Sequence, residues 1–237
     1  MRRCPARARR SRRLTIVRTT DAERVFGDAA ALSALGALPG PYLPWGSGAM
    51  RPAGLVLVCN DVVLNERQRI VELGSGVSTV LLARLLAQRR TSGARLAAIE
   101  HDGRWARWVA GQLAREGVDD HVVVVEAPLL GHPAADEQVG WYDEAAIGSG
   151  LDAAFGGEPI DLLVVDGPPA FAVGHGTSRY PALPVLRNRL APGATVVLDD
   201  IERPGEQVVL ERWEREFRLT FDRRLAGVAM ATVGSAG

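Results

Sequence analysis

The residues from 70 to 79 have the types and spacing needed to bind a nucleotide-like ligand. A short apolar run carries a carboxylate at Glu72, two glycines follow at Gly74 and Gly76, and an apolar-periodic helix is expected directly afterwards. Glycines let the backbone approach a ligand closely, and a helix start offers unpaired N–H groups at the positive end of its dipole. The segment therefore predicts a cofactor site at the carboxyl end of a first parallel strand.

Two residues of this segment distinguish between cofactors. A dinucleotide fingerprint requires a third glycine where this chain has Thr79, whereas Glu72 suits S-adenosylmethionine, which has a cationic amino-acid end. Here the chain resembles the class I S-adenosylmethionine-dependent methyltransferases, whose first motif reads Glu/Asp-x-Gly-x-Gly. The resemblance implies cofactor binding by Glu72, Gly74, Ser75, Gly76, Ser78 and Thr79.

The ends of the second and third expected strands supply further candidate cofactor residues. Glu100 ends the second strand, where an acidic side chain accepts hydrogen bonds from both ribose hydroxyls, although a helix-capping or solvated carboxylate is the alternative. We interpret His101 as lining the adenosine pocket and Asp102 as the cap of the next helix. The resemblance places contacts to the adenine edge at Ala127 and Pro128.

Three acids follow the fourth and fifth expected strands, namely Asp166, Asp199 and Asp200. Their strands are neighbours in this topology, and buried carboxylates without partners are costly, so together they suggest a cation. Capping and loop hydrogen bonds are the alternative explanation. Catechol-type and macrolide-sugar O-methyltransferases bind a divalent metal at the positions these acids match. That resemblance implies a metal site and a role for Asp166 in cofactor binding and catalysis, and oxygen ligands favour Mg²⁺.

The chain departs from the catechol type where that family has a catalytic lysine, because Pro169 stands there. His175, in a glycine-rich loop, is our candidate for the general base, against the alternative of an ordinary surface histidine. Arg179 and Arg203 are interpreted either as ligands of an anionic substrate or as partners of the nearby acids. Trp141-Tyr142 before the fourth strand is shared with a broad bacterial group of small methyltransferases, and the resemblance covers roughly residues 45 to 233.

The hydrophobic pattern alternates strands and helices from residue 69 onward, which predicts a parallel sheet with helices on both faces. We expect an α/β fold, a Rossmann-like class I methyltransferase sheet of five parallel strands plus a C-terminal antiparallel hairpin, with an N-terminal helical cover. The expected strands are 69–73, 95–100, 121–126, 160–165 and 194–199, with hairpin strands at 218–222 and 227–233. The expected helices are 21–38, 51–63, 78–90, 103–116, 137–154, 179–191 and 206–216.

The 237 residues are enough for one such domain with an extension. We expect a basic, disordered tail at 1–18, the helical cover at 19–65 and the S-adenosylmethionine-binding domain at 66–237. Residues 2 to 13 contain seven arginines, which leaves 21 basic against 28 acidic residues elsewhere. The two cysteines are expected to be unpaired, which favours a cytoplasmic location, and no apolar run reaches the roughly 18 residues of a membrane span.

The sequence therefore predicts methyl transfer from S-adenosylmethionine to an oxygen of a small molecule, assisted by a divalent metal. A metal-independent N- or O-methyltransferase and an aminopropyltransferase are alternatives within enzymes. A nucleic-acid-binding module that uses the arginine-rich tail is a third, and the acidic body counts against it. A homodimer is left open as the assembly, and the sequence does not identify the methyl acceptor.

Overall fold

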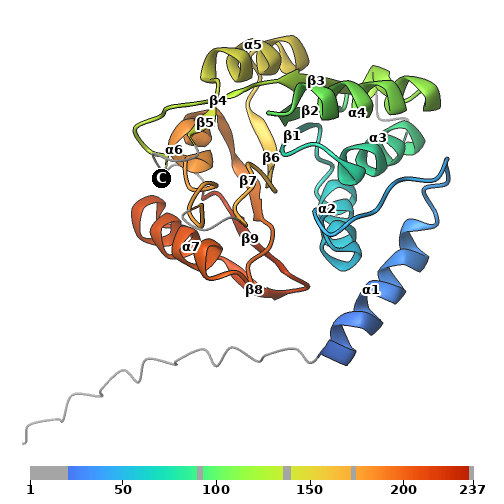
Figure 1. Cartoon of the computed structure of the whole chain (residues 1–237), viewed down its shortest axis with the longest axis horizontal. Coiled ribbons are helices and arrows are strands. Elements are labelled where there is room, and N and C mark those ends of the chain that lie inside the picture. The colour runs from blue at the N-terminus through green and yellow to red at the C-terminus, as the bar shows by residue number, and fades with distance from the viewer. Residues whose placement is uncertain (1–20, 90–92, 136–139, 172–174, 235–237) are drawn as a thin grey trace, which may run out of the picture.

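The computed structural model describes residues 21–89, 93–135, 140–171 and 175–234. A seven-stranded sheet with the order β3-β2-β1-β6-β7-β9-β8 forms the centre (Figure 1). The first five strands in this order are parallel, and β9 runs antiparallel to both β7 and β8, as predicted. The strands are β1 (Arg69–Leu73), β2 (Arg95–Glu100), β3 (Val122–Glu126), β6 (Ile160–Val165), β7 (Leu190–Leu198), β8 (Asp222–Leu225) and β9 (Val228–Thr232).

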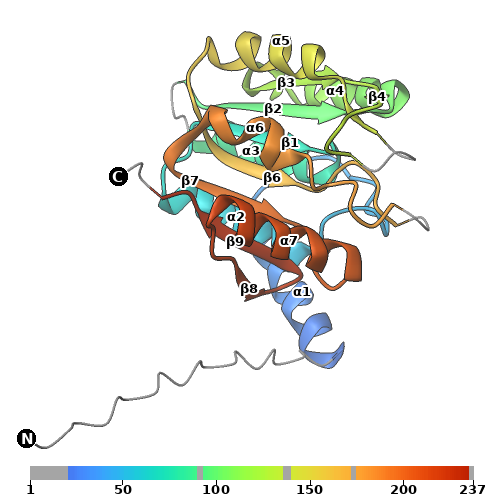
Figure 2. The same cartoon turned by 90° about the vertical axis from the view of Figure 1, so that its left-hand side faces the viewer.

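Helices cover both faces of the sheet (Figure 2). One face carries α2 (Pro52–Leu64), α3 (Val77–Arg89) and α4 (Gly103–Glu116). The other carries α5 (Glu144–Phe155), α6 (Ala182–Leu186) and α7 (Pro204–Phe217). The remaining long helix, α1 (Asp21–Leu35), packs on α2. None of the helices among the described residues is long and apolar enough to cross a membrane.

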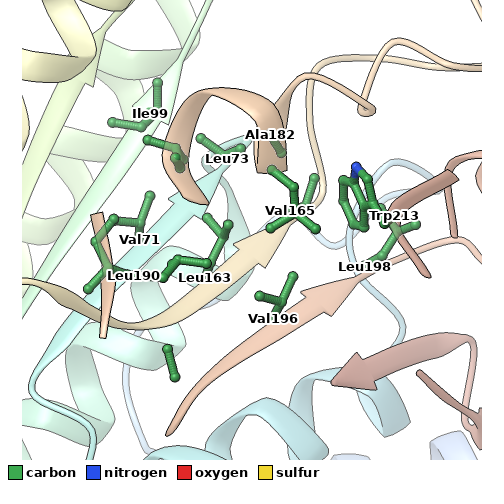
Figure 3. Close-up of a cluster of buried hydrophobic side chains, with 14 of the residues drawn as sticks. Val71, Leu73, Ile99, Leu163, Val165, Ala182, Leu190, Val196, Leu198 and Trp213 are labelled. Carbon is green, nitrogen blue, oxygen red and sulfur yellow. The ribbon is translucent and has the colours of Figure 1, made fainter. Parts of the chain in front are cut away.

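The strands are apolar on both sides because both sides are covered. Along β1, Val71 and Leu73 join the cluster under α5, α6 and α7, whereas Ile70 joins the cluster under α2, α3 and α4. Figure 3 shows the first of these clusters, in which Trp213 of α7 packs beside β7. Such two-sided burial is typical of parallel sheets and fixes the register of each strand, since a slip by one residue would exchange the two faces.

Capping residues mark the starts and ends of α4 and α5. Asp102 caps α4 by accepting hydrogen bonds from the backbone N–H groups of Arg104 and Trp105, which confirms the predicted cap. Asp143 caps α5 in the same way. Gly117 and Gly156 follow these helices in the left-handed conformation, where glycine is least strained.

Three expected elements differ in the structure. The helix expected at 137–154 begins only at Glu144, because Trp141–Tyr142 forms the short strand β5, which pairs antiparallel with β4 (Leu129–Leu130); residues 136–139 lie outside the described part. The helix expected at 179–191 is reduced to α6 and a 3₁₀ turn at Arg187–Arg189, and β7 already starts at Leu190.

The first hairpin strand lies at 222–225 rather than 218–222, because Arg218 adopts a left-handed conformation that ends α7. Most of the other boundaries agree within three residues. The tail expected at 1–18 lies outside the described residues.

Arg84 joins the N-terminal cover to the sheet domain. Its guanidinium bonds both carboxylate oxygens of Glu116 at 2.6 and 2.9 Å, and it donates to the carbonyl oxygens of Leu38 and Pro41. The two paired side chains are only 7% and 4% exposed. One buried cation therefore connects α3, α4 and the turn that follows α1.

We expect Arg84→Met to lower the free energy of unfolding by about 3–5 kcal/mol, because Glu116 would remain buried without a countercharge. Urea denaturation measures this change. Arg107→Met is the matched control, since the Arg107–Glu126 pair is 3.7 Å apart and its side chains are 69% and 56% exposed. The control should cost about 0.5 kcal/mol or less. Equal losses in the two variants would contradict the assigned role of Arg84.

Candidate active site

The loops after β1 and β6 touch where the predicted cofactor site begins. Gly74 has a φ of +91°, and a Cβ there would lie 2.9 Å from the carbonyl oxygen of Asp166. A Cβ on Gly167 would likewise lie 2.9 Å from the backbone of Gly74. Both positions therefore require glycine. The backbone of the glycine loop is in direct contact with the backbone at Asp166 and Gly167.

Glu72 is fully buried at the end of β1. Its Oε2 accepts a hydrogen bond of 2.5 Å from the hydroxyl of Thr79, whereas Oε1 has no hydrogen-bond partner among the described residues. Burial raises the pKa of Glu72 from 4.5 to about 7, against the opposing effect of the Ser78 and Thr79 hydroxyls. Thr79 also accepts from the backbone N–H of Gly76, so this residue orders the loop where a dinucleotide site would have glycine.

Glu100 at the end of β2 is bonded by four donors. Oε2 accepts from the backbone N–H and the hydroxyl of Ser75, and Oε1 accepts from the N–H of Asp102 and lies 2.8 Å from Nδ1 of His101. Burial alone would raise the pKa of Glu100, but these hydrogen bonds outweigh it and the pKa is lowered. Ribose hydroxyls would therefore have to replace existing donors, and the Ser75 hydroxyl and His101 are the side-chain groups they could replace.

The remaining sequence-predicted cofactor residues surround Glu100. The rings of His101 and Tyr142 meet edge-on, with their centroids 6.4 Å apart. The hydrogen bond to Glu100 raises the pKa of His101. Ala127 is fully buried and donates its N–H to the carbonyl oxygen of Glu100, and the carbonyl oxygen of Pro128 accepts from Asp143. The structure therefore brings the ends of β2, β3 and β5 together.

A cavity of about 290 Å³ lies over the glycine loop. Asp166, Trp105 and the loop residues Gly74 to Ser78 line this cavity. Four residues of the segment before α2 also line it, namely Pro44, Gly46, Gly48 and Ala49. The indole N–H of Trp105 donates to the carbonyl oxygen of Ser75 at 2.8 Å. Sequence reasoning did not identify Trp105 as part of the site.

The three acids expected at one cation site do lie together. Asp166, Asp199 and Asp200 each offer one carboxylate oxygen within 4.8 Å of the others. Burial, followed by the charge of its acidic neighbours, raises the pKa of both Asp166 and Asp199. We call these residues, together with Glu206, the acid cluster.

Arg179, which is 3% exposed, reaches into the acid cluster. Its Nη2 bonds Oδ1 of Asp166 at 3.1 Å and Oδ2 of Asp200 at 3.0 Å, and it also donates to the carbonyl oxygen of Asp166. Its Nη1 donates to the carbonyl oxygen of Asp199 at 3.2 Å. Of the two interpretations of Arg179, the structure therefore supports pairing with the local acids. Arg203 also pairs with Asp200, at 2.8 Å.

Glu206 at the start of α7 is the fourth acid of the cluster, and sequence reasoning missed it. It is fully buried, and neither carboxylate oxygen has a hydrogen-bond partner among the described residues. The nearest cations are Arg179 and Arg203, each with Nη1 at 3.8 Å. Burial raises the pKa of Glu206 to about 7. A glutamate in the first turn of a helix reads as an ordinary helix-dipole partner, so the sequence carried no signal of this burial.

His175 lies in a turn beside the acid cluster. The turn is held by the carbonyl oxygen of His175, which accepts from the N–H and hydroxyl of Ser178. A Cβ on Gly205 would lie 2.1 Å from the carbonyl oxygen of Gly176, so the turn packs directly on the start of α7. This position is near the acids, and the role of His175 as a base stays a prediction.

The phenol of Tyr142 is a further polar group near the ends of β1 and β6. Its hydroxyl is buried and has no hydrogen-bond partner among the described residues. A Cβ on Gly167 would lie only 2.3 Å from this oxygen. The ring thus reaches the contact between the loops after β1 and β6, and both Tyr142 and Trp141 are buried in the core.

Several solved structures are similar to this chain over most of its length. The O-methyltransferase from Bacillus cereus in complex with S-adenosylhomocysteine is 19% identical, with a TM-score of 0.58 over 92% of this chain and 93% of that one. TomG from Streptomyces achromogenes, an O-methyltransferase in tomaymycin synthesis bound to S-adenosylmethionine, is 20% identical, with a TM-score of 0.54 over 93% and 92%. A methyltransferase from Geobacter sulfurreducens is 14% identical, with a TM-score of 0.53 over 93% of both chains.

At these identities the similarity shows the fold alone, and it confirms the predicted Rossmann-like sheet. No curated protein matches the chain. Residues 71–201, which run from β1 to the acid cluster and make up more than half of the chain, match the family described as a methyltransferase domain. The chain belongs to the methyltransferase-domain family, and it is a class I S-adenosylmethionine-dependent methyltransferase.

Proposed function

We propose that this methyltransferase transfers the methyl group of S-adenosylmethionine to an oxygen atom of a small molecule. The observation that carries the proposal is the position of Asp166. This acid lines the cavity over the glycine loop and is also a member of the acid cluster. A methyl donor over the loop and an acceptor at the cluster would therefore meet at one residue.

The cofactor fits the residues present in two respects. The unpartnered Oε1 of Glu72 suits the ammonium group of the donor. Gly74, where a Cβ would clash with Asp166, has no side chain that could fill the cavity. We assign Gly74, Ser75, Gly76, Ser78 and Thr79 to the same end of the ligand. Glu100 and His101 are assigned to the ribose, and Ala127 and Pro128 to the adenine.

S-adenosylmethionine supplies an electrophilic methyl group on a sulfonium, so the protein has mainly to align the acceptor. The acceptor oxygen forms the new O–C bond with a lone pair, and the S–CH₃ bond breaks with its electron pair going to sulfur. The proton of the acceptor passes to a base. In this proposal Asp166 orients the acceptor hydroxyl and His175 takes the proton.

A divalent metal is a second proposed component of this site. Carboxylate oxygens of Asp166, Asp199 and Asp200 within 4.8 Å of one another suit a hard ion such as Mg²⁺. Such an ion would lower the pKa of an acceptor hydroxyl. Without it, the same acids would orient the acceptor, and N-methylation would use the same geometry.

The similar structures from Bacillus and Streptomyces are O-methyltransferases, which favours oxygen over nitrogen as the acceptor atom. A cytoplasmic location remains part of the proposal and rests on the unpaired, buried Cys59. A homodimer remains open as the assembly.

The first prediction concerns cofactor binding. The protein should bind S-adenosylhomocysteine, and Glu100→Gln should weaken binding by about 1–3 kcal/mol, because a charged acceptor of the ribose hydroxyls is lost. Isothermal titration calorimetry measures both affinities. Glu126→Gln is the matched control, since Glu126 stands beside Glu100 in the register of β2 and β3 but is exposed. Absence of binding to the wild type would refute the function, and equal affinities in the two variants would remove Glu100 from the site.

The second prediction concerns pH. Glu72 has a pKa of about 7 in the folded protein and 4.5 as an unperturbed group, so the folded form holds an extra proton between these values. The Glu72 contribution to the free energy of unfolding therefore falls as pH rises through this window, by at most about 1.4 kcal/mol per pH unit. Ionised Glu72 attracts the ligand ammonium, so affinity for S-adenosylhomocysteine should rise between about pH 6 and 7.5.

Glu72→Gln tests both trends, because the amide does not titrate. The affinity of the variant for the ligand should depend less on pH than that of the wild type, although His101 at the ribose end also has a raised pKa. Its stability should fall less steeply with pH. Asp199 and Glu206 have raised pKa values too, so part of the stability slope should persist. A wild-type affinity that falls as pH rises would contradict the assignment of Glu72 to the ammonium end.

A further inference from the structure

Acidic side chains outnumber basic side chains in the acid cluster. Four carboxylates (Asp166, Asp199, Asp200 and Glu206) face two guanidiniums, those of Arg179 and Arg203, and the two cations differ in their surroundings. Arg179 is 4% exposed at its side chain and bonds two of the aspartates, whereas Arg203 is 34% exposed and bonds only Asp200 among them. Arg179 is therefore the inner cation.

Arg179 uses carboxylates that a divalent ion would also need. Its Nη2 lies 3.1 Å from Oδ1 of Asp166 and 3.0 Å from Oδ2 of Asp200. A metal bound between these acids would place two positive charges within a few ångströms of the guanidinium, in a buried region where repulsion is weakly screened. A divalent ion and the Arg179 guanidinium therefore cannot both occupy the cluster while Arg179 stays in this position.

Glu206 offers the guanidinium a further carboxylate within the same cluster. Glu206 is fully buried, both its carboxylate oxygens lack hydrogen bonds among the described residues, and Oε1 lies 3.8 Å from Nη1 of Arg179. A buried acid without hydrogen bonds is costly, so it gains free energy by accepting a donor. If Arg179 moved so that this 3.8 Å separation shortened, its Nη1 could donate to Glu206.

We propose that Arg179 is the resident cation of the acid cluster and competes with a divalent ion for Asp166 and Asp200, with Glu206 receiving the guanidinium when the ion binds. This inference rests on the proposed function for the role of the site in methyl transfer. The competition itself is a binding property and can be measured without turnover. Arg179 is thus a positioning residue that sets how strongly the acceptor end of the crevice binds metal.

Mn²⁺ binding followed by electron paramagnetic resonance tests the competition without turnover. Arg179→Met should bind Mn²⁺ at least about ten-fold more tightly than the wild type, because the competing charge is removed. Arg203→Met is the matched control, since it removes one positive charge from the outer side of the same cluster. Arg203 also pairs with Asp200 but with no second aspartate and is more exposed, so the control should raise the affinity several-fold less than Arg179→Met does. Equal gains in the two variants would show a general charge effect and overturn the proposal, as would no gain in Arg179→Met.

Glu206→Gln tests the second position of the guanidinium. The variant should bind Mn²⁺ more weakly than the wild type, because the displaced arginine loses its charged partner. In the Arg179→Met background the same substitution should have little effect. An equal loss in both backgrounds would mean that Glu206 acts only through its charge, which would contradict the proposed exchange.

Circular dichroism shows whether each variant folds. If Arg179→Met does not fold, Arg179→Lys keeps the charge but loses the planar fork, and it should bind Mn²⁺ more tightly than the wild type. A wild-type affinity in a folded Arg179→Lys would then overturn the proposal. Calorimetry with S-adenosylhomocysteine on the same samples separates the two hypotheses, because loss of cofactor binding would refute the function while leaving the Mn²⁺ result to decide the competition.

Discussion

Compensation of buried negative charge is the constraint on which the candidate active site of this protein depends. The parallel sheet brings the ends of β1, β2, β6 and β7 to one edge, and each of these ends carries an acid: Glu72, Glu100, Asp166 and Asp199. Ionised carboxylates so close together in a buried region repel one another. Hydrogen-bond donors meet Glu72 and Glu100, and Arg179 pairs with Asp166, so the surrounding residues compensate part of this charge.

The sequence was sufficient to predict the sheet and the edge at which the candidate site lies. The bounds of β1, β2 and β6 agree with the expected ranges, because a parallel sheet covered on both faces leaves uninterrupted apolar runs. The bounds of α4 agree because Asp102 caps its start and Gly117 follows its end. The pattern failed at Trp141–Tyr142 and near Leu190. At both places an apolar segment suits a helix or a strand equally well, and only the neighbouring chain, β4 or β6, decides between them.

The partners of the site residues were less predictable than their positions. Asp166, Asp199 and Asp200 were expected together because strand topology fixes where strands end. The position of Arg179 among them depends on the path of residues 175–181, which has no regular period. The burial of Glu206 likewise depends on the contact between Gly205 and Gly176, two residues about thirty apart in sequence. Such contacts are tertiary, so neither spacing nor residue type revealed them.

The charge of Glu100 and the charge of the acid cluster are compensated by different groups. This difference limits which ligand groups can replace the present partners at each place. Besides His101, Glu100 is bonded by two backbone N–H groups and the Ser75 hydroxyl, so a neutral ligand hydroxyl can replace the Ser75 hydroxyl at little electrostatic cost. The acid cluster is compensated by Arg179 and Arg203, so only another cation or a proton can replace them without leaving buried charge unpaired. Uncharged donors can therefore enter at the end of β2, whereas entry at the ends of β6 and β7 requires positive charge.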